Sequence, residues 1–125
     1  MLTDKQIKSI IKHASRISEK STFRFKLGAV IFKGNRIIST GYNQNKSHPL
    51  PRRHFEFGTI HAEIDALLHS VQSVDGCDIY VFRKNRFGSA MARPCSMCQE
   101  ILREYGIKTA YFSIKNPPYI DSIKL

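Results

Sequence analysis

The sequence predicts an α/β domain in which one mixed, five-stranded sheet carries helices on both faces. Segments with apolar residues at helical spacing alternate with short runs rich in Val, Ile and Phe. Their order is helix, strand, strand, helix, strand, helix, strand, strand, which is typical of a single sheet with helices packed on it. A length of 125 residues is enough for one compact domain and too short for two ordinary ones. We therefore expect a single domain over residues 1–125.

The N-terminal third of the chain is expected to form a helix and then a β-hairpin. Thr3 and Gln6 fit a capping box at the start of a helix over residues 3–20, whose apolar residues fall on one face. The hairpin is expected over residues 26–42, because the tight-turn pair Gly34-Asn35 lies between two runs rich in β-branched residues.

The remainder of the chain alternates between helical and strand patterns. Gly106 stands where a glycine commonly ends a helix, and Ile64, Leu67 and Val71 are expected to face the core. The link at residues 115–118 is too short for the crossover that parallel strands need, so the last two strands are expected to be antiparallel. The expected elements are a helix at 61–72, a strand at 78–83, a helix at about 95–105, and strands at 108–114 and 119–124.

The chain is basic, with 20 Lys and Arg residues against 10 Asp and Glu residues and a formal charge of +10. Such an excess favours a polyanionic partner or a phosphorylated substrate, although a solvated surface explains it equally well. Lys5, Lys8 and Lys12 interrupt the first segment, so neither a signal peptide nor a membrane span is expected. We therefore expect a cytoplasmic protein that has no membrane partner.

The cysteines number three, and an odd number does not make a disulfide framework. Cys77 has no partner motif and is expected to be a buried free thiol. Cys95 and Cys98 are three residues apart in the first turn of an expected helix, where the helix dipole favours thiolates. Two thiolates at this spacing suit zinc, but a C-x-x-C pair also occurs in structural metal sites and in redox sites.

His61 adds a third candidate ligand from the start of another helix. Three protein ligands leave the fourth tetrahedral position of zinc open, which marks a catalytic rather than a structural site. Zinc held in this way makes water a nucleophile near neutral pH. Glu63, two residues later, can reach the open side of the metal and move a proton there. The combination of H-x-E with P-C-x-x-C is the signature of zinc-dependent nucleobase deaminases.

The chain resembles the cytidine and deoxycytidylate deaminase superfamily through two motifs, His61-Ala62-Glu63 and Pro94-Cys95-Ser96-Met97-Cys98. The resemblance extends to the strand pair at 27–32 and 37–43, and to residues 106–112 after the second motif. It implies a three-layer α-β-α fold of the cytidine deaminase type. It also implies hydrolytic deamination of a nucleobase with release of ammonia. The substrate that we expect first is cytosine in a nucleoside or nucleotide.

The same resemblance implies roles for individual residues. His61, Cys95 and Cys98 would hold zinc, and Glu63 would carry protons from the attacking hydroxide to the substrate until the amine leaves. Many members self-associate, so a homo-oligomer is expected. The substrate contacts that it implies are the backbone N–H of Ala62, the carbonyl of Pro94 and the side chain of Asn43.

The substrate itself is left open by two departures from deoxycytidylate deaminases. Gly41-Tyr42-Asn43 continues with Gln44 rather than with Gly-x-Pro, and the short final link resembles that of the free cytidine deaminase branch. The alternative is a deaminase that acts on cytosine or adenine in single-stranded DNA or in RNA such as tRNA, where the base has to be unpaired. A third class, a catalytically inactive binding protein, is disfavoured because all four chemical positions are present.

Two basic, aromatic stretches lie in expected loops ahead of the motifs. Residues 52–57 belong to a long polar loop from 43 to about 59, a length that is usually functional or mobile, and residues 83–87 precede Cys95. Cations with stacking rings suit a nucleotide or a single strand, and together the two stretches would make a basic rim for phosphate. The other interpretation is that their aromatic side chains only pin the loops to the core.

Overall fold

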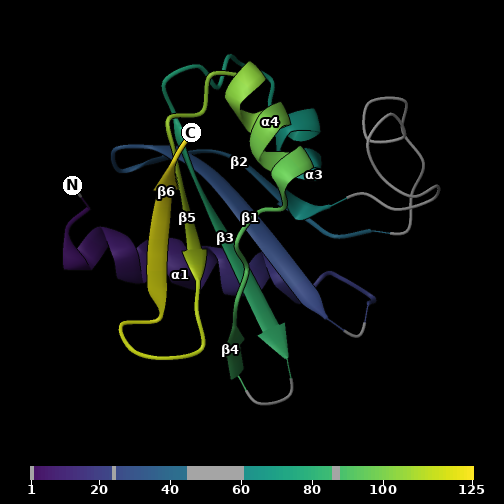
Figure 1. The fold of residues 1–125 in the computed structure, drawn as a ribbon, viewed down its shortest axis with the longest axis vertical. Helices are drawn as coiled ribbons and strands as arrows, with labels where there is room; N and C mark the ends of the chain where they lie inside the picture. The colour runs from purple at the N-terminus through teal and green to yellow at the C-terminus, as the bar shows by residue number, and fades with distance from the viewer. Residues whose placement is uncertain (1, 24, 45–60, 86–87) are drawn as a thin grey trace.

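The computed structural model shows the expected alternation of helices and strands, with one additional short strand (Figure 1). Most of the polar loop expected at 43–59, with its stretch 52–57, lies outside the described residues, and so do Arg86 and Phe87. The described residues are 2–23, 25–44, 61–85 and 88–125. The helices are α1 (Asp4–Ser18), α3 (Ala62–His69) and α4 (Ser96–Glu104). The strands are β1 (Lys26–Lys33), β2 (Arg36–Tyr42), β3 (Asp78–Asn85), β4 (Gly88–Ala90), β5 (Thr109–Ser113) and β6 (Ile120–Lys124).

The strands form one mixed sheet in the order β2-β1-β3-β5-β6, with β4 paired to β3. β1 runs antiparallel to both β2 and β3, whereas β3 and β5 are parallel. β5 and β6 are antiparallel, as the short link between them requires. The expected mixed sheet with an antiparallel ending is therefore confirmed.

β4 is the strand that the sequence does not predict. A loop that contains Gly88 and Pro94 is expected between the strand at 78–83 and the helix at about 95–105. In the structure β3 continues to Asn85, although the pairing with β5 stops at Val81. β4 takes up the pairing beyond that point and so satisfies the backbone groups at the end of β3. The loop prediction is wrong because a neighbouring strand, not the side-chain pattern, decides the structure here.

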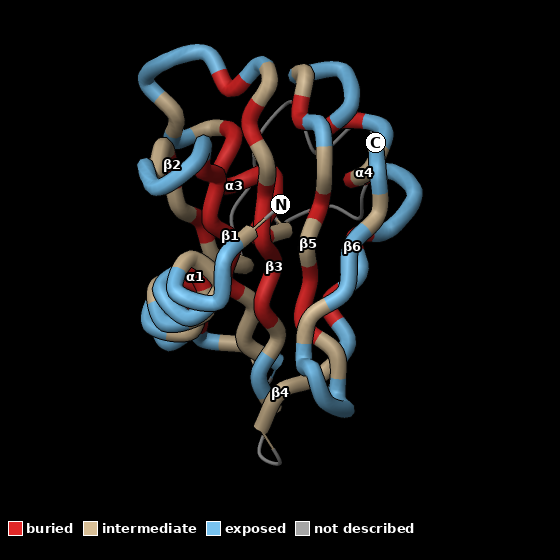
Figure 2. Tube along the Cα trace, turned by 90° about the vertical axis from the view of Figure 1, so that its left-hand side faces the viewer, coloured by how far each residue is buried: buried red, intermediate tan, exposed pale blue. Residues whose placement is uncertain are grey.

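Helices cover both faces of the sheet, which confirms the three-layer architecture (Figures 1 and 2). Successive residues of β1 and β3 alternate between the two faces, as the two-residue period of a strand requires. On the site face, α3 and α4 cover the larger buried cluster, which includes Ala29, Ile31, Ile79 and Val81. On the α1 face, the buried cluster is Ile10, Ala14, Val30, Phe32, Tyr80 and Phe82.

Two glycines let the helices approach the sheet closely. A Cβ atom at Gly28 would collide with the backbone of Ala14 in α1, and a Cβ atom at Gly41 would collide with the backbone of Ala66 in α3. No other residue type fits these two positions without moving a helix. Gly41 therefore sets the distance between β2 and α3, the helix that carries the first motif.

The helix ends agree with the sequence at two positions and differ at one. Thr3 forms the expected capping box of α1, and Gly106, with a φ of +85°, ends α4 as expected. The helix expected at 61–72 ends earlier, at His69, and Val71 is 97% exposed. The inward-facing Val71 is thus a wrong prediction. The Ser70 hydroxyl donates a hydrogen bond to a nearby backbone carbonyl instead of continuing the helix, which is a common way for serine to end one.

Two further expectations concern single features of the chain. Cys77 is a free thiol and is 2% exposed, so the expected buried cysteine is confirmed. No helix within the described ranges has both the length and the apolar character that a membrane crossing requires.

Candidate active site

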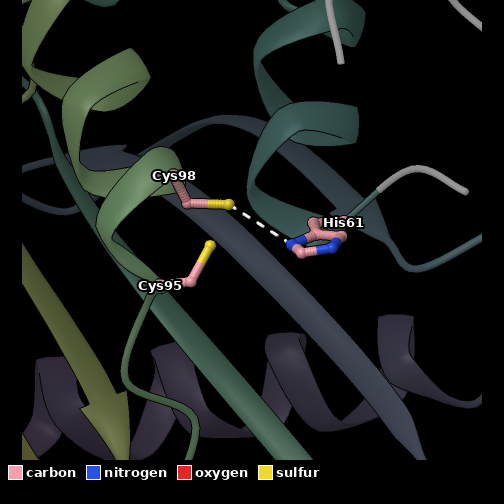
Figure 3. A group of neighbouring side chains, drawn as sticks. All are labelled: His61, Cys95 and Cys98. Carbon is pink, nitrogen blue, oxygen red and sulfur yellow. Dashed lines mark hydrogen bonds between the residues drawn. The ribbon is translucent and has the colours of Figure 1, made fainter. Parts of the chain in front are cut away.

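The first residues of the two motifs meet at the starts of α3 and α4. His61 is the residue that precedes α3, and Cys95 is the residue that precedes α4. Both have extended backbone, so their side chains project from the helix end rather than from its side. Cys98 follows in the first turn of α4. Figure 3 shows the three side chains pointing toward one another from the two helices.

The donor atoms of these three residues form a compact group that could hold a metal ion. Their ligand atoms lie within 4.8 Å of one another, and His61 Nδ1 is 3.4 Å from Cys98 Sγ. Around a tetrahedral zinc ion, nitrogen and sulfur ligands lie about 3.5–3.8 Å apart. One imidazole nitrogen and two sulfurs are also the donor types that zinc prefers. The residues present therefore fit zinc in both geometry and chemistry.

The two thiols differ in acidity because they are linked to each other. Hydrogen bonds from the Cys98 and His61 side chains lower the pKa of Cys95 to about 4. The hydrogen bond between Cys98 and Cys95 raises the pKa of Cys98, and burial raises that pKa further. Cys95 is therefore a thiolate at neutral pH, and a metal that binds here has to displace the proton of Cys98.

Glu63 is a buried carboxyl beside the same group. It lies in the first turn of α3 and is 4% exposed. Burial raises the pKa of Glu63, and this effect outweighs a backbone hydrogen bond and the charge of His61, which act in the opposite direction. A carboxyl group whose pKa is raised by burial is suited to accept and release a proton during a reaction.

Asp65 is a second buried carboxyl on α3, and the sequence did not single it out. Its Oδ2 accepts a hydrogen bond of 3.0 Å from the backbone N–H of Tyr42, and His69 Nδ1 lies 3.4 Å from its Oδ1. Asp65 therefore ties α3 to the end of β2, next to Asn43. The two carboxyl groups of α3 thus have different surroundings. Asp65 connects α3 to β2, whereas Glu63 lies beside the metal-binding group and lines a pocket there.

That pocket has a volume of about 540 Å³, within the range of small-molecule sites. His61, Ala62, Glu63 and Cys95 line one part of it. Its other walls are largely apolar, with two arginines and one asparagine. They are Phe23, Phe25, Leu27, Asn43, Arg83, Met91, Ala92 and Arg93.

The structure brings most of the predicted site residues to this pocket. Asn43 lines the pocket. The amide of Asn43 also binds the chain at the start of β1 through two hydrogen bonds of 2.9 Å: Oδ1 accepts one from the Leu27 N–H, and Nδ2 donates one to the Phe25 carbonyl. Pro94 is buried and is not among the residues that line the pocket. Its carbonyl accepts a hydrogen bond of 2.8 Å from the Gln99 side chain.

Several lining residues were not identified from the sequence as site residues. Phe23, Phe25, Met91 and Arg93 carry no motif, and only the fold brings them beside the two helix starts. Arg83 was expected both as the last residue of the strand at 78–83 and as the first residue of the basic stretch 83–87, and it belongs to β3. A signal for it was available: it follows Ile79 and Val81 at a spacing of two, so its side chain continues their row toward the site face.

Comparisons with known proteins agree with this arrangement. Residues 3–114 match the family described as the cytidine and deoxycytidylate deaminase zinc-binding region. An uncharacterized deaminase encoded in the luxG 3′ region of Aliivibrio fischeri is 34% identical over 92 residues, which are 69% of this chain and 56% of that protein. The chain therefore spans little more than half the length of this relative.

Two solved structures share the fold. The dCMP deaminase of cyanophage S-TIM5, in complex with dCMP and dUMP, superposes with a TM-score of 0.71 at 22% identity, over 93% of this chain and 86% of that one. Cytidine deaminase from Burkholderia pseudomallei gives a TM-score of 0.66 at 20% identity, over 98% and 93% of the two chains. Because the family match spans residues 3–114, the chain belongs to the cytidine and deoxycytidylate deaminases.

Proposed function

We propose that the chain uses zinc to deaminate the cytosine base of a nucleoside or nucleotide. One observation carries the proposal: an imidazole nitrogen and two sulfurs converge beside a pocket that His61, Cys95 and the buried Glu63 line. A redox dithiol or a purely structural metal site needs neither a buried carboxyl nor a pocket beside it. Hydrolysis of an exocyclic amine needs both.

The residues that would hold zinc are His61, Cys95 and Cys98. Zinc bound there would supply the Lewis acidity that makes water a nucleophile near neutral pH. Glu63 takes a proton from the attacking water and passes it to the ring nitrogen, and later protonates the departing amine. The balance is one cytosine and one water in, one uracil and one ammonia out.

The remaining site residues bind and orient the base. Ala62 is the first residue of α3, where backbone N–H groups have no partner within the helix and can donate to a substrate carbonyl. We assign Asn43 a contact with the substrate through the N–H donor and the lone pair of its amide that its two hydrogen bonds do not use. Pro94 keeps one carbonyl lone pair beside its bond to Gln99, and we assign it a contact with the amine.

Cytosine is favoured over adenine by the relatives that share the fold. The cyanophage structure is described with dCMP and dUMP, which are the substrate and product of cytosine deamination. The second candidate is a base in a single strand, and the formal charge of +10 favours it. The compact pocket favours the first candidate, because it has the size of a small-molecule site.

The test is product analysis with zinc-loaded protein. Cytidine, deoxycytidine, dCMP, adenosine, a single-stranded DNA with one internal cytosine, and tRNA are offered separately, and mass spectrometry follows the gain of oxygen for nitrogen. We expect uracil products from the free nucleoside or nucleotide. Product from the DNA or tRNA alone would favour the second candidate, inosine alone would show that the base is adenine, and no product from any of them would refute the proposal.

A further inference from the structure

Arg83 continues the row of β3 side chains that face α3 and α4. Ile79 and Val81, two and four residues earlier, are completely buried in the cluster of the site face. Because the side chains of a strand alternate, Arg83 points to the same face, at the end of the core and at the wall of the pocket. An arginine at the end of a buried row needs an explanation, because an apolar residue would extend the core.

Among the residues that the structure describes, an aromatic ring contacts the guanidinium group of this arginine, and no ion pair neutralises it. The guanidinium carbon lies 4.5 Å from the centre of the Phe25 ring, a cation–π contact that fixes the plane of the group. Its Nε is buried and has no hydrogen-bond partner among the described residues. Neither of the ion pairs found in the described part of the chain includes Arg83. A buried N–H without a partner is costly, and ligand sites are where such groups are retained.

The charge around the pocket identifies the kind of ligand. Arg83 and Arg93 line it together, and Glu63, beside the metal-binding group, is the acidic residue among its lining residues. A planar guanidinium offers parallel N–H donors that match a phosphate in a bidentate arrangement. His61, Glu63 and Cys95 line the same pocket. One pocket thus brings groups suited to processing the base together with groups suited to binding a phosphate.

We propose that Arg83 binds a phosphate group of the substrate, so that the enzyme acts on cytosine nucleotides in preference to cytosine nucleosides. This inference rests on the proposed function and narrows its substrate class. Phe25 holds the guanidinium in place before the substrate arrives, which reduces the ordering that binding requires. The phosphate is either the monoester of a free nucleotide or a diester of a strand, and the experiment separates these sources.

The experiment compares Arg83→Gln with the wild type on dCMP, deoxycytidine and a short single-stranded DNA with one cytosine. Arg36→Gln is the matched control, because Arg36 is exposed at the opposite end of the β1–β2 hairpin and outside the pocket. Zinc content and thermal unfolding confirm that each variant is folded and loaded. Calorimetric binding of dUMP is measured as well, so that the result does not depend on turnover alone.

We expect Arg83→Gln to lower kcat/KM for dCMP by about 10–100-fold and to weaken dUMP binding similarly, as the loss of a charge-assisted hydrogen bond predicts. Turnover of deoxycytidine should change by less than about twofold, and Arg36→Gln should behave as the wild type. Arg83→Lys should restore part of the dCMP activity, because it keeps the charge but not the planar fork.

Equal losses on dCMP and deoxycytidine, or no loss on either, would overturn the role of Arg83 and leave the proposed function intact. A loss confined to the DNA would place the phosphate in a strand. Inactivity of the wild type toward every cytosine compound would instead refute the proposed function, and unaltered dUMP binding by Arg83→Gln would then refute the phosphate site independently.

Discussion

The two faces of the sheet are both covered by helices, yet their interiors differ in chemistry. Under α1 the buried residues are apolar except for Ser18 and the hydroxyl of Tyr80. Under α3 and α4 the structure buries Glu63, Asp65 and Cys98 among apolar side chains. The same strands supply both faces, because alternate residues of β1 and β3 point in opposite directions.

The difference suggests a division between packing on the α1 face and the proposed catalysis on the site face. On the α1 face, most of the buried side chains are apolar. The site face keeps polar groups in the interior, which costs stability unless those groups are paired or bind a ligand. Substitutions on the two faces should therefore separate stability from activity, and the following predictions use matched residues to test this.

The largest effect is expected for Cys95→Ser, which removes one of the three candidate zinc ligands. Zinc measured by mass spectrometry should fall from about one ion per chain to nearly none, with deaminase activity lost in parallel. Cys77→Ser is the control on the same face: its buried hydroxyl should lower the free energy of unfolding by about 1–3 kcal/mol without loss of zinc. Full zinc content in Cys95→Ser would contradict the ligand set.

The next effect is expected for Glu63→Gln, which keeps the shape of the side chain but cannot carry a proton. The value of kcat should fall by about 10²–10⁴-fold while zinc content stays the same. Glu100→Gln, at an exposed position of α4, is the control and should keep wild-type rates. Near-normal turnover by Glu63→Gln would show that another group carries the proton.

A direct comparison of the faces uses the two glycines at the helix–sheet contacts. Gly41→Ala forces α3 away from β2, and Gly28→Ala forces α1 away from β1. Each should lower the free energy of unfolding by about 1–3 kcal/mol or more. Only Gly41→Ala should also lower kcat/KM of the folded protein, by about 10²-fold, because it displaces the helix that begins at His61. Equal activity losses in both variants would show that the faces are not independent.

The smallest effect is expected for Tyr80→Phe on the α1 face. Tyr80 is 1% exposed, and its hydroxyl has no hydrogen-bond partner among the described residues. Removing the hydroxyl should raise the free energy of unfolding by about 1 kcal/mol in a denaturant titration and leave activity unchanged. The control Tyr111→Phe, at a partly exposed site beside Phe32, should change it by less than about 0.5 kcal/mol. A destabilised Tyr80→Phe would reveal a partner for the hydroxyl.

Local sequence signals predicted the elements well where the physics is local. Thr3 and Gln6 form a cap within one turn, Gly34 and Asn35 form the tight turn of the hairpin, and Gly106 ends α4, because each signal acts over a few residues. Elements that depend on partners distant in the sequence were predicted less well. β4 exists because the end of β3 needs a partner, and the early end of α3 turned Val71 outward.

The sequence by itself determined which residues are candidates for the chemistry, because the candidate metal ligands and the proposed proton carrier lie in two short motifs at the starts of helices. Tertiary structure alone decided what surrounds them. Phe25 directly precedes β1, Arg83 lies near the end of β3, and Arg93 belongs to the segment before α4. They line one pocket because β1 and β3 are paired in the sheet that carries α3 and α4. Substrate choice depends on such long-range contacts, and no local pattern records them.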